Sequence, residues 1–214
     1  MAQQVHAVLI ADVVGSRTHE NLRHSLAQIL AQASQKHLHE KLILLPYTVT
    51  AGDEFQTITA QPSKVPRVLL ELRVMFHPLS LRIGIGIGRI PERIRPPVNQ
   101  LSGEAFQFAR SALDRVKSGG SFKFETLTSF VSSNAAFNDT INLVSGLNDT
   151  LVLGVTPKQW QTIAAFLKTG FLERAAKILR LDISTVSRNL KRGYYWQQSE
   201  TVKVAESLLH RTFY

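Results

Sequence analysis

The chain has 214 residues, of which 44% are hydrophobic and 19% are charged. This is the composition of an ordinary soluble globular protein, long enough for one large domain or two small ones. Because it contains no cysteine, disulfides and thiolate metal sites are excluded, and we expect a cytoplasmic location. No apolar run has the length of a membrane span, and the first residues lack the order of a signal peptide, so we expect no membrane contact. The net charge of +9 indicates a polyanionic partner, either nucleic acid or nucleotide phosphates.

Strands and helices are predicted to alternate along the first part of the chain. Apolar β-rich runs predict the strands, and apolar residues at helical spacing predict the helices. The expected elements are a strand at 5–11, a helix at 20–37, strands at 42–50 and 56–60, a helix at 62–76, a strand at 81–88, a helix at 103–118, a strand within 122–130 and a helix at 134–155. This order predicts a mixed sheet with helices on one face.

Isoleucine and glycine alternate over residues 81–88, at the period of a strand with one bare face. A helix or a ligand must therefore lie close against the face on which the glycines lie. We favour close packing, because the segment lacks the turn spacing and the following helix start of a phosphate-binding loop.

The pattern changes after Gly154. Thr156 and Pro157 are residue types typical of a helix N-cap and a first helical position. Short helices are expected at 157–169, 172–179, 182–192 and 201–209. Three short helices that are joined by tight turns and end in a basic helix are typical of a helix-turn-helix. We therefore expect a small all-α DNA-binding domain over residues 154–214.

Two segments resemble known DNA-binding helices. They are Ala175-Ala176-Lys177-Ile178-Leu179 and Thr185-Val186-Ser187-Arg188, which resemble the helix-turn-helix of bacterial regulators such as the LuxR-type and sigma-factor C-terminal modules. Val186 and Leu190 would face the core, which leaves polar and basic side chains outward for bases and phosphates. The candidate DNA-binding residues are Ser184, Thr185, Ser187, Arg188, Asn189, Lys191 and Arg192. The turn position that glycine usually fills is Arg180, so either Arg180 adopts a left-handed conformation or the turn differs from the usual one. The alternative is a helical oligomerisation module with a basic surface.

Acidic residues lie at two predicted strand ends. Asp53 and Glu54 lie at the tip of a predicted hairpin that turns at Gly52, and Asp12 follows the first apolar run. Carboxylates on neighbouring strand ends could hold a divalent metal over a phosphate. Each could instead be a turn or cap residue with no metal.

Four segments resemble motifs of the class III nucleotidyl cyclases, and they occur in that family's order. They are residues 10–16, 50–55, 81–88 and 103–110. The second also resembles the Gly-Gly-Asp-Glu-Phe hairpin of diguanylate cyclases. Together with the C-terminal helices, the layout resembles the bacterial SatD family. The resemblance implies an α+β fold in which a ferredoxin-like βαββαβ palm domain at residues 1–153 precedes the helix-turn-helix domain.

The same resemblance implies a ligand, which is Mg²⁺ with the phosphates of a nucleotide. The implied metal ligands are Asp12, Asp53 and Glu54, and the implied nucleotide-binding residues are Gly15, Ser16 and Gly52. Palm domains of the cyclase family pair across their active faces, and helix-turn-helix proteins usually bind two half-sites. We therefore expect a homodimer.

Three catalytic positions of the cyclase pattern are changed in this chain. The asparagine that orients the ribose falls on Gln107, the arginine that stabilises transition-state charge on Ser111, and the base-selecting lysine on Val49. Arg110 is one residue short and is expected to point about 100° away around its helix. Cyclisation needs charge stabilisation at the leaving pyrophosphate, so no catalytic residue is assigned and turnover is not expected.

We interpret the sequence as that of a DNA-binding transcriptional regulator with a non-catalytic, cyclase-like domain that senses a nucleotide or a metal. Two alternatives stay open. One is an active nucleotidyl or diguanylate cyclase, and the other is a non-catalytic adaptor for protein interaction.

Overall fold

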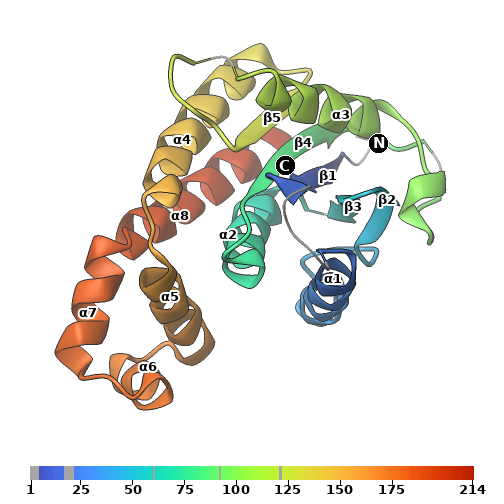
Figure 1. Ribbon diagram of the computed structural model, residues 1–214. Helices are drawn as coiled ribbons and strands as arrows, with labels where there is room; N and C mark the ends of the chain where they lie inside the picture. Colours follow the sequence, from blue (N-terminus) through green and yellow to red (C-terminus); the bar gives the residue numbers. More distant parts are fainter. Residues whose placement is uncertain (1–4, 17–21, 60, 92, 121) are drawn as a thin grey trace.

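A five-stranded sheet forms the centre of the molecule, and a lobe of helices extends from it (Figure 1). The structure is a computed structural model that describes residues 5–16, 22–59, 61–91, 93–120 and 122–214. The strands are β1 (His6–Val13), β2 (Thr48–Ala51), β3 (Glu54–Thr59), β4 (Leu81–Gly88) and β5 (Thr128–Ser132). The helices are α1 (Leu22–His39), α2 (Val65–Phe76), α3 (Glu104–Lys117), α4 (Ala135–Leu153), α5 (Pro157–Thr169), α6 (Leu172–Leu179), α7 (Ile183–Arg192) and α8 (Tyr195–Phe213), with short 3₁₀ turns η2 (Pro62–Lys64) and η3 (Val98–Gln100).

The strand order across the sheet is β2-β3-β1-β4-β5. The strand β1 pairs antiparallel with both β3 and β4, and β5 adds a parallel strand at the edge next to β4. The first four strands thus have the order of a ferredoxin-like core, and the predicted alternation of strands and helices is confirmed. The predicted hairpin is also confirmed, since β2 pairs with β3 across a turn at residues 52 and 53.

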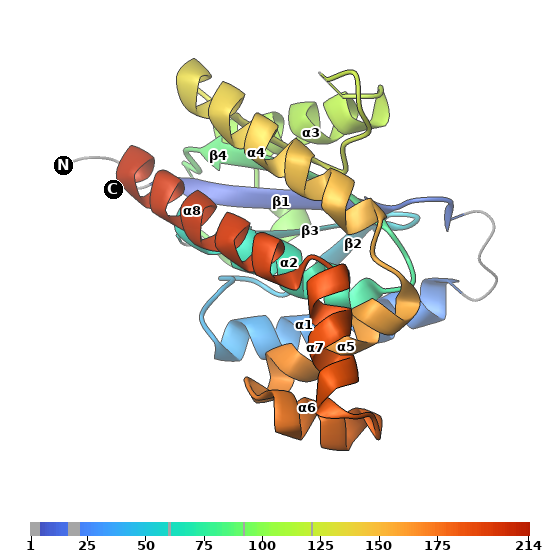
Figure 2. The ribbon, with the colours of Figure 1, turned by 90° about the vertical axis from the view of Figure 1, so that its left-hand side faces the viewer.

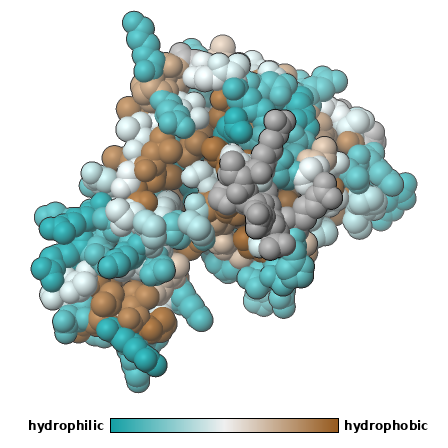
Figure 3. Space-filling view, viewed as in Figure 1, coloured by the Kyte–Doolittle hydropathy of each residue, from teal (hydrophilic) through white to brown (hydrophobic). Residues whose placement is uncertain are grey.

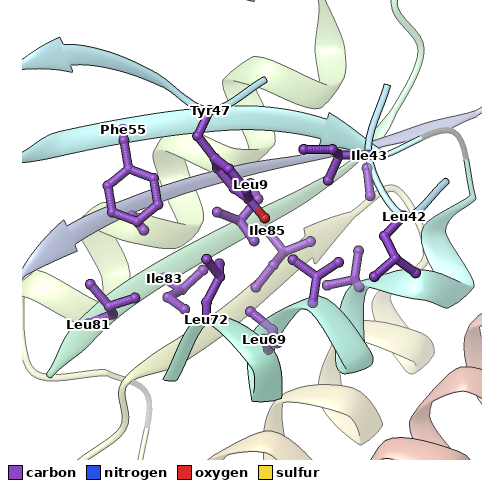
Figure 4. Packing of buried hydrophobic residues seen from close by; sticks show 14 of the residues in the cluster. Leu9, Leu42, Ile43, Tyr47, Phe55, Leu69, Leu72, Leu81, Ile83 and Ile85 are labelled. Carbon is purple, nitrogen blue, oxygen red and sulfur yellow. The ribbon is translucent and has the colours of Figure 1, made fainter. Parts of the chain in front are cut away.

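The helices cover both faces of the sheet, so the prediction that they lie on one face is wrong. On one face, α2 packs its leucines against the isoleucines of β4, as Figure 4 shows for Leu69, Leu72 and Ile85. On the other face, α3 packs against the glycines of β4. A Cβ added at Gly84 or Gly86 would overlap backbone atoms of α3. The bare face of the Ile–Gly strand is therefore filled by a helix backbone, as the sequence favoured.

Two predicted strands differ from the structure in their boundaries by more than two residues. The expected strand at 42–50 is reduced to β2, because Pro46 lacks a donor and the preceding residues form a loop instead. In this loop Leu42, Ile43 and Leu45 point inward and are buried. The strand expected within 122–130 lies at 128–132, since the preceding Phe122 and Phe124 stack on each other. The predicted start of the first helix, near residue 20, lies outside the described residues.

A buried ion pair joins three elements. Asp149 of α4 is fully buried and is bonded by the guanidinium of Arg73 of α2, and it also accepts the N–H of Leu127 at 2.8 Å. Arg73 donates to Thr128 of β5 at 2.7 Å as well. These bonds compensate for the burial of charged groups, which without partners would cost on the order of several kcal/mol.

The C-terminal helices are tied back to the sheet by the last of them. The helices α5, α6 and α7 pack around Ile163, Val186 and Leu190. The helix α8 then runs back over α2 and α4, where Ala205 and Leu209 enter the main core beneath the sheet (Figures 1 and 2). The predicted helix at 201–209 is thus the inner part of a longer one. The domain boundary after residue 153 stays a prediction, because α8 belongs to both parts by its packing.

Candidate functional site

The structure brings the end of β1 and the tip of the β2–β3 hairpin side by side. Asp12 lies near the end of β1 with 6% of its surface exposed. The carboxylate of Asp53, in the hairpin turn, accepts the N–H of Val13 at 3.0 Å. Glu54, the first residue of β3, is also buried. The three carboxylates predicted to bind a metal are therefore neighbours on one edge of the sheet.

Three basic side chains surround these carboxylates. Arg82 of β4, which is opposite Asp12 in the strand register, donates to its Oδ1 at 3.1 Å. The ammonium of Lys117, from the last turn of α3, lies 2.9 Å from Oδ2 of Asp12 and 3.7 Å from Oε2 of Glu54. Arg110 of α3 donates to both carboxylate oxygens of Glu54, at 2.7 and 2.6 Å. Bidentate pairs of this kind are among the stronger charge-assisted hydrogen bonds.

The cluster is electrically balanced without an added ion. Asp12, Asp53 and Glu54 carry three negative charges, and Arg82, Arg110 and Lys117 carry three positive ones. The hydrogen bonds from Arg110 hold the pKa of Glu54 below its usual range against the opposing effect of burial. Glu54 is thus ionised and paired at neutral pH.

The arrangement does not fit a divalent metal ion as it stands. Mg²⁺ needs carboxylate oxygens that are free to enter its coordination shell, whereas the oxygens of Asp12 and Glu54 face the protein's own cations. Within the described ranges, no group of three histidine, aspartate or glutamate side chains is placed to hold a metal. The role of Asp12, Asp53 and Glu54 as metal ligands stays a prediction.

The glycines predicted to bind a nucleotide form turns. Gly15, directly after β1, has φ of 69°, and Gly52, in the hairpin, has φ of 61°. Both values lie in the left-handed region that glycine adopts at little cost. Ser16 directly follows Gly15 and is the last residue described before residues 17–21, which lie outside the described residues. Nucleotide binding by these three residues stays a prediction.

The side chains of α3 that contact the carboxylates are not the ones expected from the sequence. Gln107 and Ser111 are exposed, whereas Arg110, expected to point away from the site, is the residue that bonds the hairpin. Lys117 lies two helical turns further on and therefore on the same side of α3. The sequence reasoning missed Arg82, Lys117 and this contact of Arg110. The seven-residue spacing of the two helix cations was an available signal, but the pairing of Arg82 required the strand register.

In the C-terminal lobe, a short turn joins α6 to α7. Arg180 has φ of 54° there, so of the two alternatives that the sequence left open, the left-handed conformation is the one adopted. The N–H of Leu181 donates to the carbonyl of Ala176 at 3.0 Å and closes α6. The helix α7 buries Val186 and Leu190 against α5 and α6, as expected.

The outer face of α7 is polar and basic. Of the candidate DNA-binding residues, Ser184, Ser187, Arg188, Lys191 and Arg192 are exposed. Thr185 is half-buried and accepts a hydrogen bond from Arg188 at 3.2 Å. Asn189 turns inward and donates to Thr162 of α5 at 3.2 Å. Five of the seven candidates therefore share one accessible face.

This lobe carries most of the excess positive charge of the chain. Residues 154–214 contain ten lysines and arginines and four acidic residues, a net charge of six out of the total of nine. Figure 2 shows α7 on the outside of the lobe, in front of α5. Figure 3 shows apolar surface at the α6 end of the lobe. Ile178 of α6, Leu181 of the turn and Ile183, the first residue of α7, are exposed.

The fold and the site define an α+β protein with a ferredoxin-like palm, ion-paired carboxylates at its strand ends and a basic helical lobe. The chain belongs to the SatD family, whose family model matches residues 6–208. No match was found among the curated proteins. Along the part of the chain that the structure describes, none of the helices has the length and apolarity needed to cross a bilayer.

Solved structures similar to the chain include cyclase domains. The guanylyl cyclase domain of the RhoGC fusion protein from the aquatic fungus Blastocladiella emersonii is 12% identical, with a TM-score of 0.42, covering 52% of this chain and 74% of its own. An adenylate cyclase structure from Trypanosoma brucei is 13% identical, with a TM-score of 0.43 and coverage of 72% and 83%. A regulator of polyketide synthase expression from Bifidobacterium adolescentis is 18% identical, with a TM-score of 0.31 and coverage of 97% and 85%. These TM-scores are too low for any of the likenesses to carry an argument.

Proposed function

We propose that this SatD family protein is a DNA-binding transcriptional regulator whose cyclase-like palm does not turn over nucleotides. The observation that carries the proposal is the exposed face of α7, where Arg188, Lys191 and Arg192 project from a helix that follows a tight turn. A basic helix presented in this way fits the major groove of DNA, which is about 12 Å wide.

The position of each side chain on α7 suggests its role. Ser184, Ser187 and Arg188 lie in the first two turns, where a recognition helix contacts base edges, and arginine is the side chain best suited to guanine. Lys191 and Arg192 lie in the last turn, where they can reach backbone phosphates. The exposed apolar Ile183 can contact the methyl group of thymine. Thr185 and Asn189 would instead orient Arg188 and hold α7 on α5.

The ion pairs of the palm support a non-catalytic role. Phosphoryl chemistry at such carboxylates needs a metal ion and a cation on the leaving group. Here Lys117 and Arg110 are bonded to Asp12 and Glu54, and Gln107 and Ser111 replace the polar groups that the cyclase pattern uses. A Mg²⁺–nucleotide ligand would bind by displacing these cations. Such a displacement is the form that nucleotide or metal sensing would take in this protein.

The proposal keeps the expectation of a cytoplasmic homodimer, because a pair of α7 helices would read two half-sites. Selection from a random duplex library at low salt tests DNA binding. We expect the wild-type chain to retain DNA and to lose it as salt rises. Arg188→Ala should relax the sequence preference among the selected duplexes, whereas Lys123→Ala, on an exposed loop of the palm, should leave it unchanged. The absence of salt-sensitive retention would rule out the proposal.

Turnover is tested separately. The purified chain is incubated with ATP or GTP and Mg²⁺ or Mn²⁺, and cyclic products are separated by chromatography. We expect none above the level of an Asp12→Ala variant. Product that this variant abolishes would favour the alternative of an active cyclase.

A further inference from the structure

A cleft lies between the palm and the C-terminal lobe. It encloses about 710 Å³, which is within the range of about 300–1,000 Å³ typical of small-molecule sites. Four helices form its walls, α1 and α2 on the side of the sheet and α5 and α8 on the side of the lobe. In Figure 3 the molecular surface is notched between the lobe of α5 to α7 and the part that carries α1.

The inner walls of the cleft are apolar. They are lined by Leu70, Val74 and Met75 of α2, by Ala164 and Leu167 of α5, and by Val202 of α8. On each helix the lining residues recur at helical spacing, so they share one face of the helix, and this face is turned to the cleft. Leu167 is 38% exposed. Apolar surface that a neighbouring element does not cover is available to a ligand.

The rim of the cleft is cationic. Lys36 and Arg67 lie on the palm side, and Lys168 and Lys203 lie on the lobe side. Lys203 pairs with the exposed Glu200, and a surface pair of that kind contributes little. Among the described residues, no ion pair is found for Lys168.

The two carboxylates that line the cleft, Glu71 and Glu40, already have cationic partners within the protein. Glu71 accepts from Lys36 at 2.6 Å and His37 at 3.1 Å through one oxygen, and from Arg67 at 2.8 Å through the other. Glu40 pairs with Lys36 and Arg67. With Glu200 at Lys203, four cations face three carboxylates, and the remaining charge of the cleft is positive. A cationic ligand would have to compete with these cations for a carboxylate, whereas an anion could bind Lys168 and could draw Lys203 from its exposed pair with Glu200.

We propose that this cleft binds an amphipathic organic anion, with an apolar body against α2 and α5 and a carboxylate at Lys168 and Lys203. The ligand would touch the palm and the lobe at once, so its binding would fix α5 relative to α2. This site is separate from the carboxylates of β1 and the hairpin, and it does not depend on DNA binding by α7.

A dansyl-labelled undecanoate serves as the probe, since its fluorescence rises when it leaves water. We expect a saturable rise with the full chain, which unlabelled dodecanoate reverses and dodecyltrimethylammonium does not. The variant Lys168→Glu with Lys203→Glu should weaken the affinity about tenfold or more, because charge attraction becomes repulsion. Leu167→Asn should weaken it through the loss of apolar contact. Lys168→Gln with Lys203→Gln should give a smaller loss in the same direction.

The matched control is Lys158→Glu, an exposed residue of α5 that does not line the cleft. It should change the affinity by no more than about twofold, as expected for a distant surface charge. Circular dichroism and thermal melts establish that each variant is folded. Equal affinity of all variants, equal competition by the cationic amphiphile, or no saturable binding would each overturn the proposal.

Discussion

The ammonium of Lys117 lies 2.9 Å from Oδ2 of Asp12, where the end of β1 meets the last turn of α3. It also lies 3.7 Å from Glu54. A lysine between two carboxylates supplies the positive charge that a bound metal ion would otherwise bring. Its removal should leave an excess of negative charge on this edge of the sheet.

The first prediction is that Lys117→Ala creates a metal site. In the absence of a nucleotide the wild-type chain should not bind Mn²⁺, whereas the variant should bind it with a Kd on the order of 1 mM or below, in the range of weak carboxylate sites. The loss of free Mn²⁺ signal in electron paramagnetic resonance measures this directly. Lys123→Ala removes an exposed lysine elsewhere on the palm and should bind none. Equal Mn²⁺ binding by wild type and Lys117→Ala would show that Lys117 does not stand in for a cation.

The second prediction concerns Glu71. Burial would raise its pKa, but hydrogen bonds from His37, Lys36 and Arg67 outweigh burial and lower the pKa to about 2 from an ordinary value of 4.5. Since the folded pKa lies below the unfolded one, the ionised group stabilises the fold above pH 4.5, and this stability is lost as the pH falls towards 2. The shift corresponds to about 3 kcal/mol.

Urea unfolding of wild type and Glu71→Gln as a function of pH measures this contribution. The wild type should be the more stable by about that amount at neutral pH, and the two should converge as the solution is acidified. The two proteins share the other titrating carboxylates, so the difference isolates Glu71. A difference in unfolding free energy that does not change with pH would contradict the assignment.

The third prediction concerns the glycine face of β4. A Cβ at Gly86 would overlap the carbonyl of Ala105 and the N–H of Ala109 in α3. Because both are backbone atoms of a packed helix, Gly86→Ala should destabilise the protein by about 3 kcal/mol or more. Gly154→Ala is the control, since its Cβ would meet the nearest atom at 3.5 Å. Equal melting temperatures for the two variants would mean that α3 does not pack as described.

The fourth prediction concerns the buried pair of α2 and α4. Asp149→Asn leaves Arg73 charged and without its carboxylate, and it should cost about 3–5 kcal/mol. The double variant Arg73→Met with Asp149→Leu should recover part of this loss, because two apolar side chains leave no buried charge. Thermal unfolding measures both. A double variant no more stable than the single one would place the cost in the other bonds of Asp149, such as that to Leu127.

Much of the fold could be predicted from the sequence because local patterns determine it. The alternation of strands and helices and the hairpin at Gly52 each follow from a few neighbouring residues, and a left-handed Arg180 was one of the two alternatives for its turn. The side of the sheet on which α3 packs could not be read in that way. It depends on how the crossover from β4 to β5 places α3 against Gly84 and Gly86, and a linear pattern of Ile and Gly shows only that something must fill the bare face.

The candidate site was predictable in its acidic half alone. Asp12 and Asp53 follow recognisable strand ends, so their proximity could be inferred. Their basic partners come from β4 and α3, about 70 to 105 residues away in sequence from Asp12, and long-range pairing of this kind has no local signal. The expectation that Arg110 points away assumed the helix orientation of a cyclase, whereas α3 of this chain turns Arg110 towards Glu54.

The central claim is that α7 binds DNA, and the salt dependence of binding tests it most directly. The affinity for a duplex taken from the library selection is measured by fluorescence anisotropy over a range of salt concentrations, for wild type, Lys191→Ala with Arg192→Ala, and Lys123→Ala. If both helix cations contact phosphates, the double variant should bind more weakly, and its slope of log affinity against log salt should be shallower by about 2. The Lys123→Ala slope should equal that of the wild type. A double variant with the wild-type affinity and slope would contradict the account.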